Sequence, residues 1–439
     1  MNQSRRQEYV DRLLSFLNGS PTAFHATANA EAYLAGHGFS RLREEEPWTL
    51  EPGGKYYVKR NNSALIAFER GTADVADSGF GIIGAHTDSP SFKIKPGGCM
   101  LTGDGYRKIN TEPYGGGGIL STWFDRPLSI AGRVILKTDN AMRPEERLVD
   151  LGRPVAVIPN LCIHFNREIN SGYSYNKQID MLPLLGLAGG ASGDDPVPAL
   201  AAAELQIDAS RIIDHDLFLY ESAPGCLTGV DGEFISASRI DNLSMVHAGL
   251  DGLVRSGPAA RTKILAAFDN EEVGSVSAPG ANSGFLMGVL RRICLCSGAG
   301  EEGVYRALAG SVAISADCAH AVHPNYPEKH DPVNRPVLGA GPVIKYSAPV
   351  RYATNAVTAA IFAQVCEEAN VPCQKFVNRS DIPGGSTIGP AMSSLTSVPT
   401  VDVGTPVLAM HSVREFGSVC DNVHTARAFA AFYSYPGGA

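Results

Sequence analysis

Four apolar runs in this chain each end at side chains that can bind a metal ion. The first run, residues 79–84 (GFGIIG), leads to His86 and Asp88. The other three runs also have the character of buried strands, and they lead, in order, to Glu271 and Glu272, to Asp317, and to His411. In an open α/β sheet the carboxyl ends of parallel strands line one crevice. We therefore predict that these side chains, although far apart in the sequence, converge on one site.

Two acidic residues, Asp88 at the end of the first run and Asp241 outside these runs, strengthen the prediction. A strand that stops at His86 presents an imidazole at the sheet edge, and Asp88, two residues on, can hydrogen-bond its other nitrogen. Asp241 opens an amphipathic stretch, residues 243–254, whose apolar spacing predicts a helix. Because an acidic side chain is stabilised at a helix N-terminus, Asp241 is a further candidate ligand.

These residue types match the requirements of a site that holds two divalent cations. Such a site needs a carboxylate that bridges the metals and terminal ligands on each side. The chain supplies that inventory with His86, Asp241, Glu272, Asp317 and His411. Imidazole and carboxylate without thiolate favour zinc, with cobalt or manganese as substitutes. Of Glu271 and Glu272, one is expected to bind metal and the other to act as the general base that takes a proton from a metal-activated water.

Composition limits the classes of protein to consider. The chain has 439 residues, which exceeds the usual size of one core, so two domains are expected. No apolar run is long enough to cross a bilayer and the N-terminal residues lack the apolar core of a secretion signal, so we expect a cytoplasmic protein with no membrane partner. The net charge of −8, without a block of Lys and Arg, argues against nucleic acid as a partner. The scattered cysteines fit reduced thiols, so a metal would be held by oxygen and imidazole.

The chain changes character between two of the candidate ligands. Residues 91–236 contain short β-like runs with frequent turn residues, whereas strands alternate with helices beyond them. This block lies between His86 and Asp241, and insertions enter domains at surface loops. We predict a catalytic domain made of residues 1–90 plus 237–439, with a mostly parallel sheet, and an inserted β-rich domain of residues 91–236.

Other patterns receive ordinary structural interpretations. An isolated histidine is more often a hydrogen-bonded structural residue than a ligand, and that role is assigned to His25, His37, His215 and His247. The glycines at 115–118 lack the strand-loop-helix context of a phosphate loop. No Gly-x-Ser-x-Gly elbow is present, which disfavours a serine hydrolase and leaves metal-activated water as the leading nucleophile.

Four motifs in this order resemble the aspartyl aminopeptidase family of dinuclear zinc exopeptidases. They are residues 84–90 (GAHTDSP), 268–275 (FDNEEVGS), 320–326 (HAVHPNY) and 410–415 (MHSVRE). The similarity extends over nearly the whole chain. It implies a zinc-exopeptidase-like α/β/α sandwich with an inserted β-rich oligomerisation domain.

The resemblance also implies a role for each site residue. His86 and Asp317 match the terminal ligands of one zinc, and Glu272 and His411 match those of a second zinc in the same subunit. Asp241 matches the bridging carboxylate. Asp88 matches the acid that orients the imidazole, and Glu271 matches the general base.

Further residues are implicated in substrate binding by the same resemblance. Lys345 matches a lysine that recognises an acidic side chain, with His320 and Tyr352 as other pocket positions. His164 matches a histidine that reaches the active site of a neighbouring subunit. The family assembles as homo-oligomers, and the resemblance implies a dodecamer whose substrates are short peptides.

The expected function is therefore a cytoplasmic zinc aminopeptidase that removes N-terminal Asp or Glu from short peptides. One alternative is a neutral aminopeptidase or a deacylase of N-acyl amino acids on the same dinuclear-metal scaffold. A non-catalytic assembly protein is another alternative, although it would have no need to retain both Glu271 and Glu272.

Overall fold

The computed structural model describes residues 3–188 and 195–436. These residues form two compact units. The first contains the described residues up to Asp88, Gly225–Met410 and those from Glu415 onward, and the second contains the described residues of Ser89–Pro224 together with His411–Arg414. Among the described residues, no helix combines the length and the apolar character needed to cross a bilayer.

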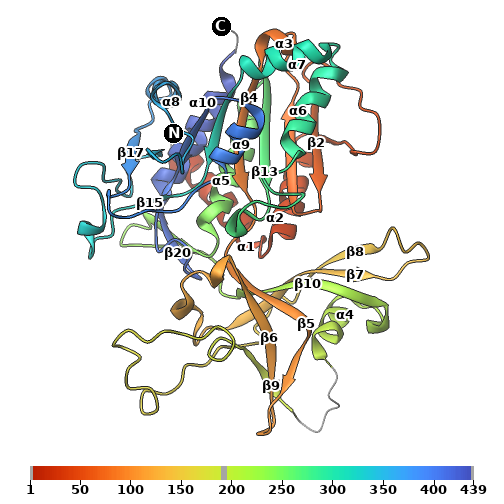
Figure 1. Cartoon of the computed structure of the whole chain (residues 1–439), viewed down its shortest axis with the longest axis vertical. Helices are drawn as coiled ribbons and strands as arrows, with labels where there is room; N and C mark the ends of the chain where they lie inside the picture. Colours follow the sequence, from red (N-terminus) through yellow and green to blue (C-terminus); the bar gives the residue numbers. More distant parts are fainter. Residues whose placement is uncertain (1–2, 189–194, 437–439) are drawn as a thin grey trace. The chain divides into compact units, whose positions relative to one another are not determined.

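A nine-stranded sheet forms the centre of the first unit (Figure 1). Its strands, in spatial order, are β1 (Ser40–Arg41), β2 (Lys55–Arg60), β3 (Ala64–Glu69), β13 (Thr262–Phe268), β4 (Phe80–His86), β14 (Val312–Ala316), β18 (Thr400–Gly404), β16 (Val343–Tyr346) and β17 (Gln374–Val377). The four central strands, β13, β4, β14 and β18, run parallel to one another. Their carboxyl ends therefore lie at the same edge of the sheet, as the sequence predicts.

Alternating side chains of the central strands enter two separate cores, which explains why these strands are apolar throughout. In β4, for example, Ile83 and Ala85 belong to one core, whereas Phe80 and Ile82 belong to the other. Helices that pack on the first core are α1 (Gln3–Asn18), α2 (Ala23–Gly36), α5 (Ile240–Arg255), α8 (Ala356–Glu368) and α10 (Val419–Ser434). Those on the second are α3 (Val75–Ser78), α6 (Phe285–Cys296), α7 (Gly300–Ala309) and α9 (Gly389–Thr396). This arrangement confirms the α/β/α sandwich.

A smaller five-stranded sheet completes the first unit. Its order is β11 (Cys226–Thr228), β12 (Phe234–Ala237), β20 (Glu415–Ser418), β19 (Pro406–Leu408) and β15 (Ala319–His320). Because β12 pairs with β20, residues 225–236 belong to the first unit, although the sequence analysis places them in the inserted domain. Cross-strand pairing with a segment almost two hundred residues later is not visible in local sequence.

The second unit is built on a six-stranded antiparallel sheet. Its order is β8 (Glu145–Asp150), β7 (Leu128–Leu136), β10 (Ile212–Glu221), β5 (Ser91–Leu101), β6 (Tyr106–Tyr114) and β9 (Leu184–Leu187), with helix α4 (Pro196–Leu205) packed on its core. Short 3₁₀ turns occur in both units: η1 (Gly115–Gly117), η2 (Leu120–Trp123), η3 (Ala209–Arg211), η4 (Glu271–Val273) and η5 (Pro327–Lys329). Val413 is buried in the same core as the strands, so the segment His411–Arg414 is part of this unit.

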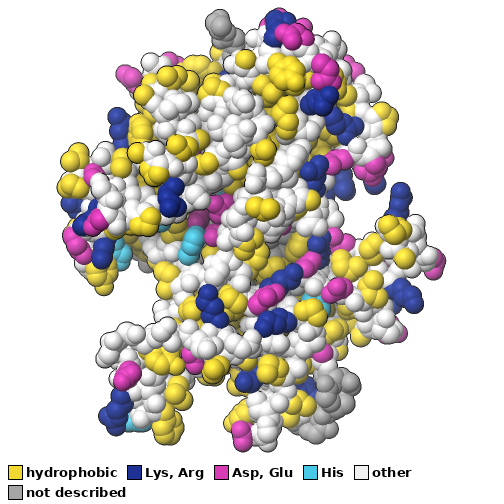
Figure 2. Space-filling model, in the orientation of Figure 1, with side chains coloured by type: hydrophobic (Ala, Val, Ile, Leu, Met, Phe, Trp, Pro, Cys, Tyr) yellow, Lys and Arg dark blue, Asp and Glu magenta, His cyan; other side chains and the backbone are white. Residues whose placement is uncertain are grey.

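Surface charge is mixed. On the face shown in Figure 2, Lys and Arg side chains are scattered among acidic and apolar ones and form no large basic patch. This distribution agrees with the net charge of −8.

Candidate metal centre

Strand register brings the first elements of the centre together. Phe268, the last residue of β13, pairs with His86, the last residue of β4. The amide of Thr87 donates a hydrogen bond to the Phe268 carbonyl at 2.7 Å, which keeps the two strand ends side by side. The turn η4 follows β13 and carries Glu271 and Glu272. These acids therefore lie beside the imidazole because two parallel strands end in register.

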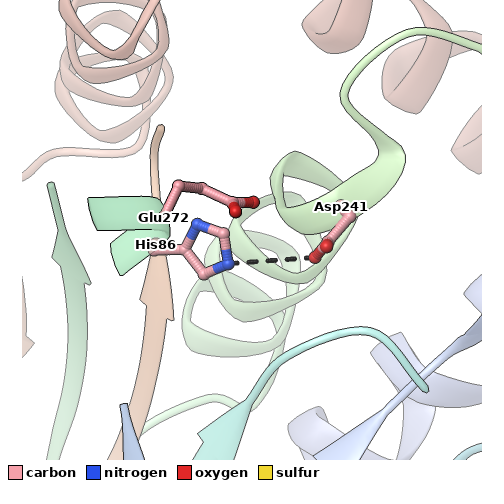
Figure 3. Close-up of side chains that lie close together, drawn as sticks. All are labelled: His86, Asp241 and Glu272. Carbon is pink, nitrogen blue, oxygen red and sulfur yellow. Dashed lines mark ion pairs between the residues drawn. The ribbon is translucent and has the colours of Figure 1, made fainter. Parts of the chain in front are cut away.

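Three side chains from three elements form the centre (Figure 3). One potential ligand atom from each of His86, Asp241 and Glu272 lies within 4.8 Å of the others. His86 Nε2 is 3.8 Å from Asp241 Oδ1. His86 and Asp241 are buried and Glu272 is half-buried.

Asp317 extends the cluster from a fourth element. It directly follows β14, and its Oδ1 lies 3.9 Å from His86 Nε2. The same imidazole nitrogen thus faces both Asp241 and Asp317. Four of the predicted site residues, His86, Asp241, Glu272 and Asp317, are brought together in the first unit.

Asp88 holds the other side of the histidine. His86 Nδ1 lies 3.0 Å from the Asp88 carbonyl oxygen and 3.4 Å from Asp88 Oδ1. The Asp88 carboxylate also accepts hydrogen bonds from the amides of Glu271 and Glu272, each at 3.1 Å. One carboxylate therefore orients the imidazole and fixes the turn that carries both glutamates.

The position of Asp241 depends on a residue that the sequence analysis did not select. The Asp241 amide donates to Glu415 Oε2 at 2.8 Å, and the side-chain amide of Asn242 donates to the Ala316 carbonyl at 2.8 Å. Glu415 is buried on β20. Glu415 is the last residue of the motif MHSVRE, and this was the only sequence signal for a role in the site. Its contact with α5 is visible only in the folded structure.

Negative charge accumulates among these buried groups. Burial raises the pKa of Glu271 to about 8; the charge of His86 opposes this rise, and the nearby carboxyl groups, Asp317 first among them, add to it. Burial likewise raises the pKa of Asp317 to about 7 despite the opposing charge of Lys345. Burial alone would lower the pKa of His86, yet its hydrogen bond to Asp88 and the surrounding carboxyl groups raise it well above the ordinary value. A cation would relieve this repulsion.

The donor set fits zinc. One imidazole nitrogen and several carboxylate oxygens converge, and both are common zinc ligands. Cys318 is buried near Asp241, but its pKa is raised well above the ordinary value by burial, and its thiol lies near the Ile240 carbonyl at 3.7 Å. The cluster that converges on His86 therefore offers oxygen and nitrogen ligand atoms, and Cys318 is not one of its members.

Lys345 lies at the border of this cluster. Its Nζ is 3.9 Å from Asp317 Oδ2 and donates to the Cys318 carbonyl at 3.1 Å. The same Nζ lies 5.2 Å from the centre of the Tyr352 ring. His320, the third predicted pocket residue, is exposed on β15 with its ring 5.9 Å from that of Phe376.

Two predicted site histidines belong to the second unit. The His411 carbonyl accepts a hydrogen bond from the Ile119 amide at 2.8 Å within that unit. His164 is exposed in the irregular segment between β8 and β9. Their roles as metal ligand and as a residue acting in a neighbouring subunit stay predictions.

An α/β/α sandwich whose parallel strands end in a buried cluster of histidine and carboxylates defines a metal-dependent hydrolase. Comparison with known proteins gives the family. Residues 16–433 match the model of the aminopeptidase I zinc metalloprotease (M18) family. The chain belongs to this M18 family and is a zinc metalloaminopeptidase, so the resemblance found in its motifs is confirmed. This membership also favours the enzyme over the alternative of a non-catalytic assembly protein.

Named relatives cover nearly the whole chain. The chain is 50% identical over 428 residues to a probable M18 family aminopeptidase 2 of Clostridium acetobutylicum, covering 97% of this chain and 99% of that protein. A protein of the same name from Pseudomonas aeruginosa (strain UCBPP-PA14) is 43% identical, with 98% and 99% covered.

Solved structures show the same fold. Ape4, in its complex with Nbr1, is 38% identical with a TM-score of 0.94, covering 98% of this chain and 86% of that one. The S. cerevisiae mApe1 dodecamer is 27% identical with a TM-score of 0.86, covering 99% and 98%.

Proposed function

We propose that this aminopeptidase removes Asp and Glu from the N-terminus of short peptides. The observation that supports this specificity is the position of Lys345, a buried ammonium 3.9 Å from Asp317 at the border of the metal centre. An aminopeptidase binds the first residue of its substrate beside the metal. A lysine there can pair with the side-chain carboxylate of that residue.

We further propose two zinc ions per subunit, with Co²⁺ or Mn²⁺ as substitutes. His86 and Asp317 would hold one ion, Glu272 and His411 the other, and Asp241 both. When bound, zinc lowers the pKa of a water molecule and polarises the scissile carbonyl. The convergence of His86, Asp241 and Glu272 within 4.8 Å supports this assignment.

The remaining residues of the centre move and position protons. Glu271 acts as general base, taking a proton from the attacking water and giving it to the leaving amine. Asp88 keeps Glu271 in place through the backbone amide of that residue at 3.1 Å. The same carboxylate faces His86 Nδ1, which directs Nε2 towards the other ligands.

The assembly and location are part of the same proposal. The S. cerevisiae mApe1 structure is a dodecamer, and we propose that this chain also forms a homododecamer, in the cytoplasm. The exposed His164 would then reach the scissile carbonyl in a neighbouring subunit. Light scattering should give a mass twelve times that of the chain, and a monomeric active enzyme would contradict the role of His164.

A neutral aminopeptidase is the second candidate. The contact that places Lys345 beside Asp317 favours it, because an ammonium that already has an acidic neighbour attracts a substrate carboxylate less strongly. The two candidates differ in substrate preference and not in metal chemistry.

A panel of aminoacyl chromogenic substrates, run alongside elemental analysis, separates the candidates. The purified enzyme should cleave aspartyl and glutamyl substrates faster than leucyl or alanyl ones. Faster cleavage of leucyl or N-acetylated substrates would contradict the acidic preference. Zinc content well below two per chain, without rescue by added metal, would contradict the dinuclear site.

Replacing Lys345 with Leu should lower kcat/KM for glutamyl substrates by about 10- to 100-fold, the usual value of a hydrogen bond to a charged group. Neutral substrates should be affected much less. Lys375→Leu is the matched control, because Lys375 is an exposed lysine on the adjacent strand β17. Equal losses on acidic and neutral substrates in Lys345→Leu would contradict recognition by this side chain.

A further inference from the structure

Asp402 is a buried carboxyl group in β18 that the function proposed above does not use. It is 0% exposed. β18 pairs with β16 in antiparallel register, with Ile344 opposite Val403. This register makes Asp402 the direct cross-strand neighbour of Lys345, and such neighbours project from the same face of a sheet.

The carboxylate of Asp402 holds two loops. Its Oδ2 accepts a hydrogen bond from the Ala353 amide at 2.6 Å, and its Oδ1 accepts one from the Thr387 hydroxyl at 2.5 Å. The Asp402 amide also donates to Thr354 Oγ1 at 2.8 Å. The loop that connects β16 with α8 and the loop that precedes α9 are therefore both fastened to this residue.

A glycine allows this close approach. A Cβ on Gly389 would lie 2.4 Å from Asp402 Oδ2 and 2.6 Å from Oδ1. Real Cβ atoms do not come so near to an oxygen, so the start of α9 can pack on the carboxylate only without a side chain. The Asp402 carboxylate is thus tightly packed against the start of α9.

The first of these loops carries the residue that covers Lys345. Tyr352 directly precedes Ala353 and is buried, with its ring centre 5.2 Å from Lys345 Nζ. On its other side, Lys345 faces Asp317 Oδ2 at 3.9 Å. Asp317 is therefore the direct neighbour of this ammonium, while Asp402 lies on the adjacent strand and is among the charges that raise the pKa of Lys345.

Electrostatics gives this arrangement a functional consequence. The attraction of Lys345 for a substrate carboxylate is opposed by every negative charge held close to the ammonium. Asp317 belongs to the metal centre, where a bound cation would offset its charge. Asp402 is not one of the metal-centre residues, so no bound cation would offset its charge.

We propose that Asp402 is a positioning residue for substrate selection: its carboxylate fixes the loop that carries Tyr352, and its charge limits the attraction that Lys345 exerts on an acidic substrate side chain. The inference rests on the proposed recognition of acidic residues by Lys345. It assigns to Asp402 the tuning of that preference, and not a step of the reaction.

The test is Asp402→Asn, which removes the charge and keeps the shape. The new amide oxygen can accept from Ala353, and the new amide nitrogen can donate to the Thr387 hydroxyl, which also acts as an acceptor. We expect KM for a glutamyl chromogenic substrate to fall about tenfold, with kcat within about twofold and alanyl substrates unchanged. The gain should disappear in the double variant with Lys345→Leu.

Two further variants separate charge from structure. Thr387→Val removes one hydrogen bond and keeps the charge, so it should lower the melting temperature without raising the glutamyl-to-alanyl ratio of kcat/KM. Asp402→Ser also removes the charge, with a smaller side chain. It replaces Asp402→Asn in the test if that variant does not fold. An unchanged or lower ratio in a folded charge-removing variant overturns the inference, and so does failure of both variants to fold, because Asp402 would then be structural.

The inference and the proposed function fail in distinguishable ways. The substrate preference of the unaltered enzyme tests the proposed function. The change in the glutamyl-to-alanyl ratio between variant and unaltered enzyme tests Asp402, whichever substrate the unaltered enzyme prefers.

Discussion

Buried acidic groups occur in both units of this protein, but their surroundings differ. In the second unit, the buried carboxylate of Glu221 lies 2.5 Å from Arg126 Nη1 and 2.9 Å from Arg414 Nη2. In the metal centre of the first unit, Asp241, Glu272 and Asp317 gather around a single histidine. The comparison teaches that buried carboxylates paired with arginines have a structural role. Buried carboxylates that outnumber the nearby basic groups instead indicate a site that binds a cation.

The pKa directions follow the same division. Burial alone would raise the pKa of Asp216 in the second unit, but contacts with Lys93 and Arg133 lower it below the ordinary value. In the first unit burial raises the pKa of Glu271 to about 8, with Asp317 adding to the effect. The ionised form of a carboxyl group is thus stabilised in the second unit and destabilised in the metal centre of the first.

The largest expected effect is on catalysis by Glu271. Glu271→Gln keeps the shape but removes the general base, so kcat should fall by about 10³-fold or more while zinc content stays unchanged. Turnover and elemental analysis on the same preparation check this. Loss of metal together with activity would mean that Glu271 is the ligand and Glu272 the base.

A smaller effect is expected where the acid is matched by arginines. Glu221→Gln leaves Arg126 and Arg414 without their counter-charge and should lower the free energy of unfolding of the second unit by about 2 to 3 kcal/mol, with no change in kcat. The chain has two tryptophans, and the buried Trp123 lies in this unit. In a Trp48→Phe background, its fluorescence during urea denaturation reports the second unit alone.

The matched control for that experiment is Asp216→Asn. Asp216 also contacts two basic residues, Lys93 at 2.6 Å and Arg133 at 2.8 Å, but its own side chain is 27% exposed, against 4% for that of Glu221. Its loss should cost about 1 kcal/mol or less. Equal costs for the two variants would break the argument that burial gives the Glu221 contacts their value.

An effect smaller than that of Glu221→Gln concerns a buried histidine outside both clusters. Burial, with the charges of Arg12 and Arg255, lowers the pKa of His247 to about 3. A lowered folded-state pKa means that its contribution to stability is complete above the unfolded value near 6.5 and is lost as the pH falls below it. When the pH is lowered from 8 to 5.5, the free energy of unfolding should therefore fall by about 1.4 kcal/mol because of this histidine.

His247→Leu removes the titration and tests this sign. Urea denaturation at the two pH values should show a smaller acid-induced loss in the variant by about that amount. A loss equal to that of the unaltered protein would show that His247 takes up its proton without unfolding, and the exposed His37 provides a control whose replacement should change nothing.

Much of the fold and the positions of several candidate site residues were predictable because they depend on local pattern. The runs that end at His86, Glu271 and Asp317 are strands β4, β13 and β14, and parallel pairing aligns their ends. The helix opened by Asp241 is α5. Each of these features is carried by consecutive residues, so the sequence alone contains the signal.

Features that depend on pairing between distant segments were not predictable. Glu415 supports Asp241 from a strand that pairs with β12, and Asp402 becomes the cross-strand neighbour of Lys345 only through the register of β16 with β18. Neither arrangement can be inferred from consecutive residues in the sequence. The same reason explains why the boundary of the inserted block was predicted at 236 and not at 224.

The segment His411–Arg414 has an evolutionary consequence. Because the chain leaves the first unit a second time at this hairpin tip, and Val413 is buried in the other core, the β-rich module is not a single cassette. Grafting residues 89–224 onto a related scaffold would leave that core without one of its own side chains. Chimeras between relatives should therefore tolerate exchange of the module only when the tip of the β19–β20 hairpin travels with it.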